Sequence, residues 1–156
     1  MHCYKQRQQG LAVVEFAIIL PFVVLVAIAV AELGRGLYQY NTLNKAVRDG
    51  VRYLSDVAIQ PGGTIDIDSY RTQMKNLVVC GDIDGCSSGS ELLPGWSTDK
   101  VDAVAVPVTL ISGGPTINHI EVTATYTFAP LFDALAIGYS KIPDMSVTVT
   151  QRALRL

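Results

Sequence analysis

Charged residues are nearly absent from one long stretch near the start of the chain. Between Leu11 and Ala31 the only charged residue is Glu15. With about 1.5 Å of rise per residue, a helix over this stretch is about 30 Å long, which is the hydrocarbon thickness of a bilayer. The segment is therefore predicted to be a helix that lies in a membrane for at least part of the life of the protein.

Histidine and cysteine are also scarce among the 156 residues, with two and three copies. No motif places a nucleophile or a third catalytic group beside His119, which lies on the polar side of a predicted strand. Phosphate-binding loops, the G-x-S-x-G pattern and paired metal-ligand spacings are missing as well. The sequence therefore predicts no enzyme, no catalytic residue, no metal site and no cofactor.

The balance of charge excludes another class of partner. The chain has 12 basic and 14 acidic residues, a net charge of −2, and it contains no basic run. Binding to nucleic acid depends on neutralising phosphates with lysine and arginine. Nucleic acid is therefore not predicted as a partner, whereas a membrane is.

Positive charge precedes the apolar segment. Residues 1–10 contain Lys5 and Arg7 and no acidic residue. By the positive-inside rule, this arrangement keeps the N-terminus in the cytoplasm and exports the rest of the chain. An ordinary secretory signal peptide is the alternative, because Ala27-Ile28-Ala29 fits a small-x-small cleavage site, although the apolar core is longer than the usual 7–15 residues or so.

Glu15 is the anomaly within the apolar segment. A carboxylate in a transmembrane helix costs about 2.5–3.5 kcal/mol on insertion scales, and less near an interface, so it is expected to have a partner. If the chain were cut after Gly10, Glu15 would be the fifth residue and would lie one turn from the new α-amino group. In a packed array, the carboxylate of one subunit would then meet the amino terminus of its neighbour.

At these residues the sequence resembles the type IV prepilins, and more closely the TadE-like minor pilins and pseudopilins of tight-adherence (Tad, Flp-type) pilus systems. The resemblance covers about the first third of the chain at the level of motifs, and the remainder only in general layout. Four stretches carry it: Val14-Glu15-Phe16-Ala17, Leu20-Pro21, Glu32-Leu33-Gly34-Arg35-Gly36-Leu37-Tyr38 and Ala46-Val47-Arg48-Asp49-Gly50-Val51-Arg52-Tyr53.

The resemblance implies a minor pilin for pilus biogenesis and surface attachment, cut by prepilin peptidase between Gly10 and Leu11. Glu15 and Phe16 would serve processing and assembly. The implied partners are the peptidase, the major pilin, other minor pilins and the assembly platform in the bacterial inner membrane. The C-terminal domain would be exported or incorporated in the pilus. Two alternatives stay open: an uncleaved single-pass protein with an exported binding domain, and a domain released by signal peptidase near Val30.

The helical pattern continues past the apolar segment. Apolar residues recur at spacings of three and four to Leu54, which predicts one helix over residues 11–54, transmembrane over 11–31 and amphipathic over 32–54. Pro21 predicts a kink in it. Residues 1–10 are predicted as a cytoplasmic leader and residues 55–156 as an exported globular domain.

The remaining pattern predicts a pilin-like α+β fold, in which the long helix packs on an antiparallel sheet of three or four strands. The strands are expected over Val104–Leu110, with Pro107 at an edge, over His119–Phe128 and over Met145–Leu154. A hairpin connection is expected at 112–116, and a short helix or turn at 130–138.

A second short helix is expected to follow the capping signal at Asp66 and to end at Gly81. Cys80 and Cys86 are predicted to form a disulfide in the exported domain. The Asp-Ile-Asp pairs at 66–68 and 82–84 favour turns and a helix cap over a calcium site, although a site assembled from separate loops stays open. Trp96 is expected in an exposed loop, as a surface anchor or a partly buried residue.

Overall fold

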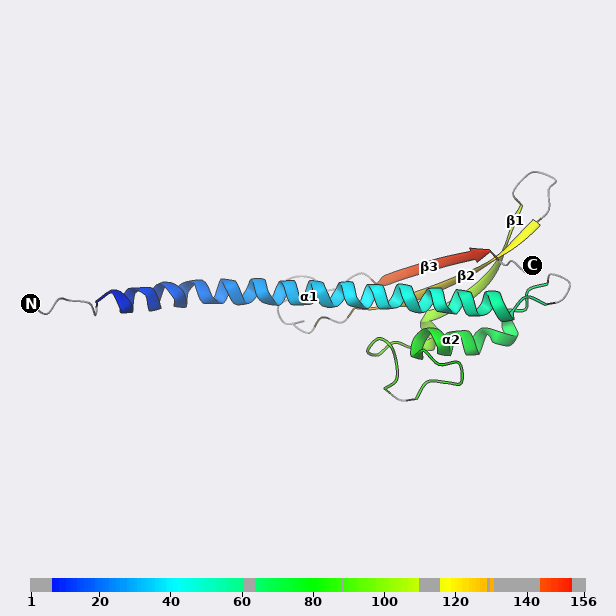
Figure 1. Cartoon of the computed structure of the whole chain (residues 1–156), viewed down its shortest axis with the longest axis horizontal. Helices are drawn as coiled ribbons and strands as arrows, with labels where there is room; N and C mark the ends of the chain where they lie inside the picture. Colours follow the sequence, from blue (N-terminus) through cyan, green and yellow to red (C-terminus); the bar gives the residue numbers. More distant parts are fainter. Residues whose placement is uncertain are drawn as a thin grey trace, which may run out of the picture. The chain divides into compact units, whose positions relative to one another are not determined.

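The computed structural model describes residues 7–60, 64–87, 89–109, 116–128, 130 and 144–152. The predicted α+β fold, with a long N-terminal helix, a short helix and a three-stranded antiparallel sheet, is confirmed (Figure 1). Most of the predicted hairpin connection at 112–116 and most of the predicted element at 130–138 lie outside the described residues, and Thr116 is already part of β2. In chain order the elements are α1 (Arg7–Val57), η1 (Asp68–Tyr70), α2 (Arg71–Cys80), η2 (Thr98–Lys100), β1 (Val101–Thr109), β2 (Thr116–Tyr126) and β3 (Met145–Arg152).

The helix α1 contributes to both of the compact units into which the chain divides, Met1–Leu37 and Tyr38–Leu156. It begins earlier and ends later than the predicted helix of residues 11–54. The peptide bond after Gly10, where cleavage is predicted, therefore lies within the helix. The division into leader, helix and exported domain stays a prediction.

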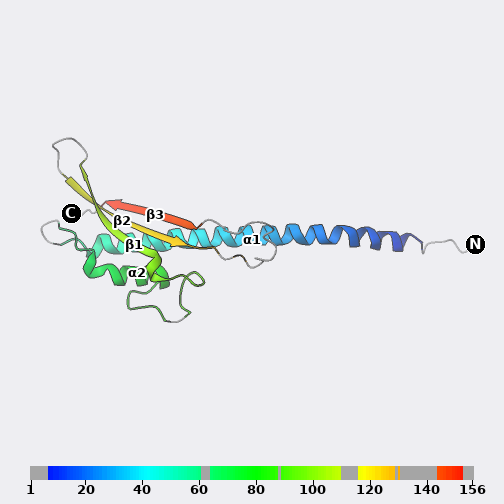
Figure 2. The same cartoon turned by 180° about the vertical axis from the view of Figure 1, so that it is seen from behind.

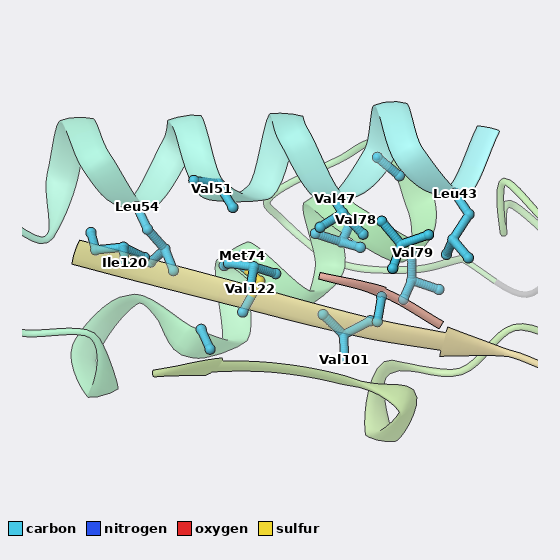
Figure 3. Close-up of a cluster of buried hydrophobic side chains, with 14 of the residues drawn as sticks. Leu43, Val47, Val51, Leu54, Met74, Val78, Val79, Val101, Ile120 and Val122 are labelled. Carbon is cyan, nitrogen blue, oxygen red and sulfur yellow. The ribbon is translucent and has the colours of Figure 1, made fainter. Parts of the chain in front are cut away.

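The second half of α1 supplies one wall of the core. Its buried side chains recur at spacings of three and four, as the sequence pattern predicted, whereas the earlier members of the same pattern are exposed, namely Leu33, Leu37 and Tyr40. Figure 3 shows this stripe facing Ile120 and Val122 of β2. The fully buried members of the stripe are Leu43, Val47, Val51 and Leu54.

The sheet has the order β1-β2-β3, with both neighbouring pairs antiparallel. Because side chains alternate between the two faces of a strand, the even-numbered residues of β2 from Ile120 to Tyr126 all point into the core. Among the β1 residues from Val101 to Pro107, the buried ones are Val101 and Ala103, whereas Val104, which the sequence pattern emphasised, is 54% exposed. The predicted edge position of Pro107 is confirmed, since β1 is an outer strand.

The helix α2 lies alongside the second half of α1 in both views (Figure 1 and Figure 2). Asp66 caps the turn that precedes it, accepting hydrogen bonds from the hydroxyl of Ser69 at 2.6 Å and from its backbone N–H at 3.2 Å. Both hydrogen bonds lower the pKa of the Asp66 carboxyl, and the bond from the Ser69 hydroxyl has the larger effect. At the other end, Gly81 adopts φ +76° and its N–H donates to the Leu77 carbonyl at 2.9 Å. The predicted end signal at Gly81 is confirmed, whereas the predicted start signal at Asp66 acts on the turn before the helix, and α2 itself begins after Tyr70 without a side-chain cap.

Trp96 belongs to the core and is not a surface anchor. Its side chain is 3% exposed, and its Nε1–H donates to the Thr125 carbonyl at 3.0 Å. Its ring meets that of Tyr126 edge to face, with centroids 6.4 Å apart. The loop after α2 is therefore held to the sheet by an aromatic side chain that fills the space beneath it.

The helices α1 and α2 pack closely at Gly50. A Cβ atom built on Gly50 would lie under 3.0 Å from Cγ2 of Val78 and 3.6 Å from the Met74 side chain. Val78 cannot easily turn away, because a β-branched side chain in a helix has one strongly preferred rotamer. We expect Gly50→Ala to lower the free energy of unfolding by up to about 2 kcal/mol, since overpacking costs about 1–3 kcal/mol and alanine returns about 1 kcal/mol of helix propensity.

Chemical denaturation of the full chain in detergent, followed by Trp96 fluorescence, measures this effect. Gly34→Ala is the matched control, because no atom lies within 4 Å of a Cβ built there. It is expected to cause no loss of stability. Equal unfolding curves for the two variants would contradict the close packing at Gly50.

Candidate functional site

The candidate site is the start of α1, from Gly10 to Phe16. Helical geometry places the side chains of this segment around the whole helix, and every one of them from Gly10 to Phe16 is exposed. Leu11 is 74% exposed and Phe16 is 63% exposed. Within the residues that the structure describes, nothing covers this part of the helix.

The apolar surface continues well beyond the site. Exposing so many apolar side chains to water is energetically unfavourable, so this surface requires lipid or protein around it. By length and composition α1 is able to cross a membrane. A signal sequence near an N-terminus meets the same criteria of length and apolar composition. The large apolar side chains that are exposed on α1 before Glu32 are Leu11, Val13, Val14, Phe16, Ile18, Ile19, Leu20, Phe22, Val23, Val24, Leu25, Val26 and Val30.

The fold itself gives no reason for a glycine at position 10. Gly10 has helical backbone geometry without a positive φ, and a Cβ atom built on it would have no neighbour within 4 Å. Glycine in a helix costs about 1 kcal/mol relative to alanine. A requirement for glycine at this position must therefore come from something that binds the segment.

The carboxylate of Glu15 forms no hydrogen bond or ion pair with any of the described residues, and its side chain is exposed. The side chain of Phe16, the next residue, is also exposed and available for contact with another molecule. A charged group in an apolar helix that has no partner among the described residues is suited to pair with another molecule.

Pro21 lies inside α1 without ending it. A proline removes one backbone hydrogen bond and crowds the preceding turn, although transmembrane helices tolerate this. The predicted kink at Pro21 stays a prediction.

A second feature of this helix, an ion pair at the end of its apolar stretch, was not identified from the sequence. Nη2 of Arg35 donates to the carboxylate of Glu32 at 3.2 Å. The spacing of three residues within a helix was the signal, because such residues are neighbours on its surface. Glu32 thus has a partner in its own helix, unlike Glu15.

The other candidates in the sequence have structural roles where the structure describes them. Cys80 and Cys86 form a disulfide, with Cα atoms 5.5 Å apart. The carboxylate of Asp82 accepts a hydrogen bond from the Asp84 N–H at 3.0 Å, which is a turn contact. His119 lies in β2 between Val106 and Arg152. In the described ranges, no group of three histidine, cysteine or acidic side chains is arranged to hold a metal ion.

Comparison with protein families gives a match for the N-terminal segment. The family model described as TadE-like protein matches residues 10–52, that is, α1 from the candidate cleavage glycine to Arg52. The resemblance predicted from the N-terminal motifs is confirmed over this segment, and it indicates an association with Tad pili and with the membrane. No curated protein and no solved structure matches the chain.

Proposed function

Taking residues 10–52 as those of a TadE-like protein, we propose that the chain is a minor pilin or pseudopilin that takes part in building a Tad-type pilus. It inserts with its N-terminus in the cytoplasm, is cut by prepilin peptidase after Gly10, and joins the pilus through α1. The observation that carries the proposal is that the family match begins at Gly10 and includes Glu15, the two residues that this mechanism needs.

The environment of Gly10 supports recognition by a peptidase. Neither packing nor backbone conformation requires glycine there, so the absence of a side chain serves a protein that must approach the backbone closely. The bond that follows Gly10 lies in an exposed segment. Lys5 and Arg7 precede this bond and keep it on the cytoplasmic side.

The environment of Glu15 supports a role in assembly. Cleavage creates a positive α-amino group on Leu11, and the exposed carboxylate of Glu15 in a neighbouring copy or sibling pilin is its natural partner. In an apolar setting, an attraction between opposite charges is much stronger than in water. The same pair removes the cost of an isolated carboxylate in the membrane. Assembly of the helices and neutralisation of Glu15 are thus one event.

The unit after Leu37 fits an exported domain that contributes to surface attachment. Its disulfide between Cys80 and Cys86 is typical of proteins that mature in an oxidising compartment. Its partners in this proposal are the major pilin, the other minor pilins and the assembly platform of the inner membrane.

The N-terminal residue and mass of the protein, purified from cells with and without their prepilin peptidase, test the proposal. We expect a chain that begins at Leu11 only when the peptidase is present. Gly10→Val is expected to retain residues 1–10 in both strains. Gly34→Val is the matched control, since Gly34 is also an exposed helical glycine without a neighbour within 4 Å, and it is expected to be cut normally.

Two other results would contradict the proposal. A chain that keeps residues 1–10 in both strains would favour the uncleaved single-pass protein, with Glu15 paired to a charge of a membrane partner. A chain that begins near Val30 would favour release of the domain by signal peptidase, and α1 would then lose its apolar half.

A further inference from the structure

The outer edge of β1 is a place where another strand could add to the sheet. In the described sheet, β1 pairs with β2 on one side only. In an antiparallel strand, the N–H and C=O groups of one residue point to the same side, and successive residues alternate between the two sides. An edge strand therefore presents a row of unpaired backbone groups, which invites pairing with another chain.

Three side chains close part of this edge, and we name them the Arg71 clamp: Arg71, Asp68 and Asp102. Nη1 of Arg71 donates to the Ala103 carbonyl at 3.0 Å and also forms an ion pair with the Asp102 carboxylate. That carboxylate in turn accepts the Ala103 N–H at 2.9 Å. Both backbone groups of Ala103 are thus occupied by side chains, which shows that they point away from β2.

Asp68 fixes the position of the arginine. Its Oδ1 accepts hydrogen bonds from Nη2 of Arg71 at 2.9 Å and from Nε at 3.3 Å. The guanidinium is therefore held from both sides, by a carboxylate on the turn before α2 and by another on β1. It has no freedom to leave the Ala103 carbonyl without breaking an ion pair.

The edge beyond the clamp is open. A cleft of about 220 Å³ lies beside it, lined by the clamp, by Ile65 and Ile67, and by β1 up to Ala105. The backbone groups of Ala105 point the same way as those of Ala103, because the two residues are two positions apart. Within the described ranges no group pairs with them. Pro107, two positions further on, has no N–H to offer.

We propose that the Arg71 clamp keeps the edge of β1 from pairing with β1 of a second copy of the chain. The edge is self-complementary: two β1 strands placed antiparallel about Ala105 would exchange a pair of hydrogen bonds between their Ala105 residues. The next pair of positions sets Ala103 of one copy opposite Pro107 of the other. With the clamp in place, the Asp102 carboxylate already accepts the Ala103 N–H, and the Arg71 guanidinium, 3.0 Å from the Ala103 carbonyl, occupies the position that the second strand would take.

Removing Asp102 frees the Ala103 N–H to donate to the Pro107 carbonyl on each side of this pairing. Removing Arg71 clears the guanidinium from the place of the second strand. The clamp consists of partly exposed ion pairs, which contribute little to folding. Its loss should therefore change self-association far more than stability. The clamp lies within the unit Tyr38–Leu156 and is independent of cleavage at Gly10.

Sedimentation equilibrium of the full chain in detergent tests the proposal. We expect Arg71→Ala and Asp102→Ala each to raise the self-association constant by about tenfold or more. The matched controls are Arg48→Ala and Asp49→Ala, which remove the same charges from exposed positions of α1. They are expected to associate as the parent does, and thermal melting of each variant establishes that it is folded.

A double variant locates the association. Ala105→Pro removes the N–H that would form the central pair of hydrogen bonds between the two copies, and an edge strand tolerates proline on its open side. Arg71→Ala combined with Ala105→Pro is therefore expected to return to the association of the parent. The proposal would be overturned if a folded Asp102→Ala or Arg71→Ala variant sedimented as the parent does, or if the double variant still associated as strongly as Arg71→Ala.

Discussion

Trp96→Ala is expected to lower the free energy of unfolding of the unit after Leu37 by about 3–5 kcal/mol, the usual cost of truncating a buried aromatic side chain. The indole is almost completely buried and contacts the ring of Tyr126 edge to face. Its removal leaves a cavity between the loop and the sheet. It also leaves the Thr125 carbonyl without its donor.

Circular dichroism during chemical denaturation measures this loss, because the variant has no tryptophan fluorescence. Trp96→Phe is the matched control: it keeps an aromatic ring in the space and loses the hydrogen bond. We expect it to cost clearly less than the alanine variant. If Trp96→Ala unfolded at the same denaturant concentration as the parent, Trp96 would not be a core residue.

Glu15→Val is expected to leave membrane insertion intact and to reduce co-purification with the major pilin by about tenfold or more. Valine is apolar and removes the only charge between Leu11 and Ala31, so insertion loses nothing. Assembly loses the partner of the new amino terminus. A penalty of about 2.5–3.5 kcal/mol for an unpaired carboxylate in a membrane corresponds to roughly 60–300-fold in an equilibrium constant, which bounds the effect.

Affinity purification of the major pilin from membranes, with quantitative detection of this chain, measures the change. Glu15→Asp keeps the charge and should retain part of the co-purification. Glu32→Gln removes an acid whose partner, Arg35, lies in the same helix, and should leave co-purification close to that of the parent. The N-terminal residue of each variant shows whether cleavage has also changed. Undiminished co-purification of Glu15→Val would remove the role of Glu15 in assembly.

Periodic sequence patterns predicted the elements that form most of the core. The stripe from Leu43 to Leu54 has helical spacing, and the strand from Ile120 to Tyr126 alternates without interruption. Each pattern is local, so it can be read without knowing the rest of the fold. The cap at Asp66 and the end of α2 at Gly81 are local in the same sense.

The features that the sequence did not reveal depend on residues far apart in the chain. Trp96 lies in a loop without a period, and its burial is decided by Thr125 and Tyr126 on β2. Arg71 and Asp102 belong to different elements, and no local pattern predicts that they meet. The buried face of β1 was also not evident, because Ala103 is small and the larger Val104 is the exposed neighbour.

The candidate site was predictable for the opposite reason. Gly10 and Glu15 stand out because they are inconsistent with the helix that holds them, one by lacking a side chain and the other by its charge. The structure adds that neither has a partner among the described residues of its own chain. The sequence of this chain does not identify a binding partner in another molecule, so the partners of Gly10 and Glu15 are proposals.

The close packing at Gly50 has a consequence for exchanging the N-terminal helix between proteins. Gly50 lies inside the segment that matches the TadE-like family, whereas Val78, which fills the space above it, lies outside. The boundary of the family match therefore cuts through the core and not around it. A chimera that joins this helix to a foreign domain must supply a side chain shaped for the gap at Gly50. The N-terminal helix and the domain that follows it therefore have to match in shape at this contact.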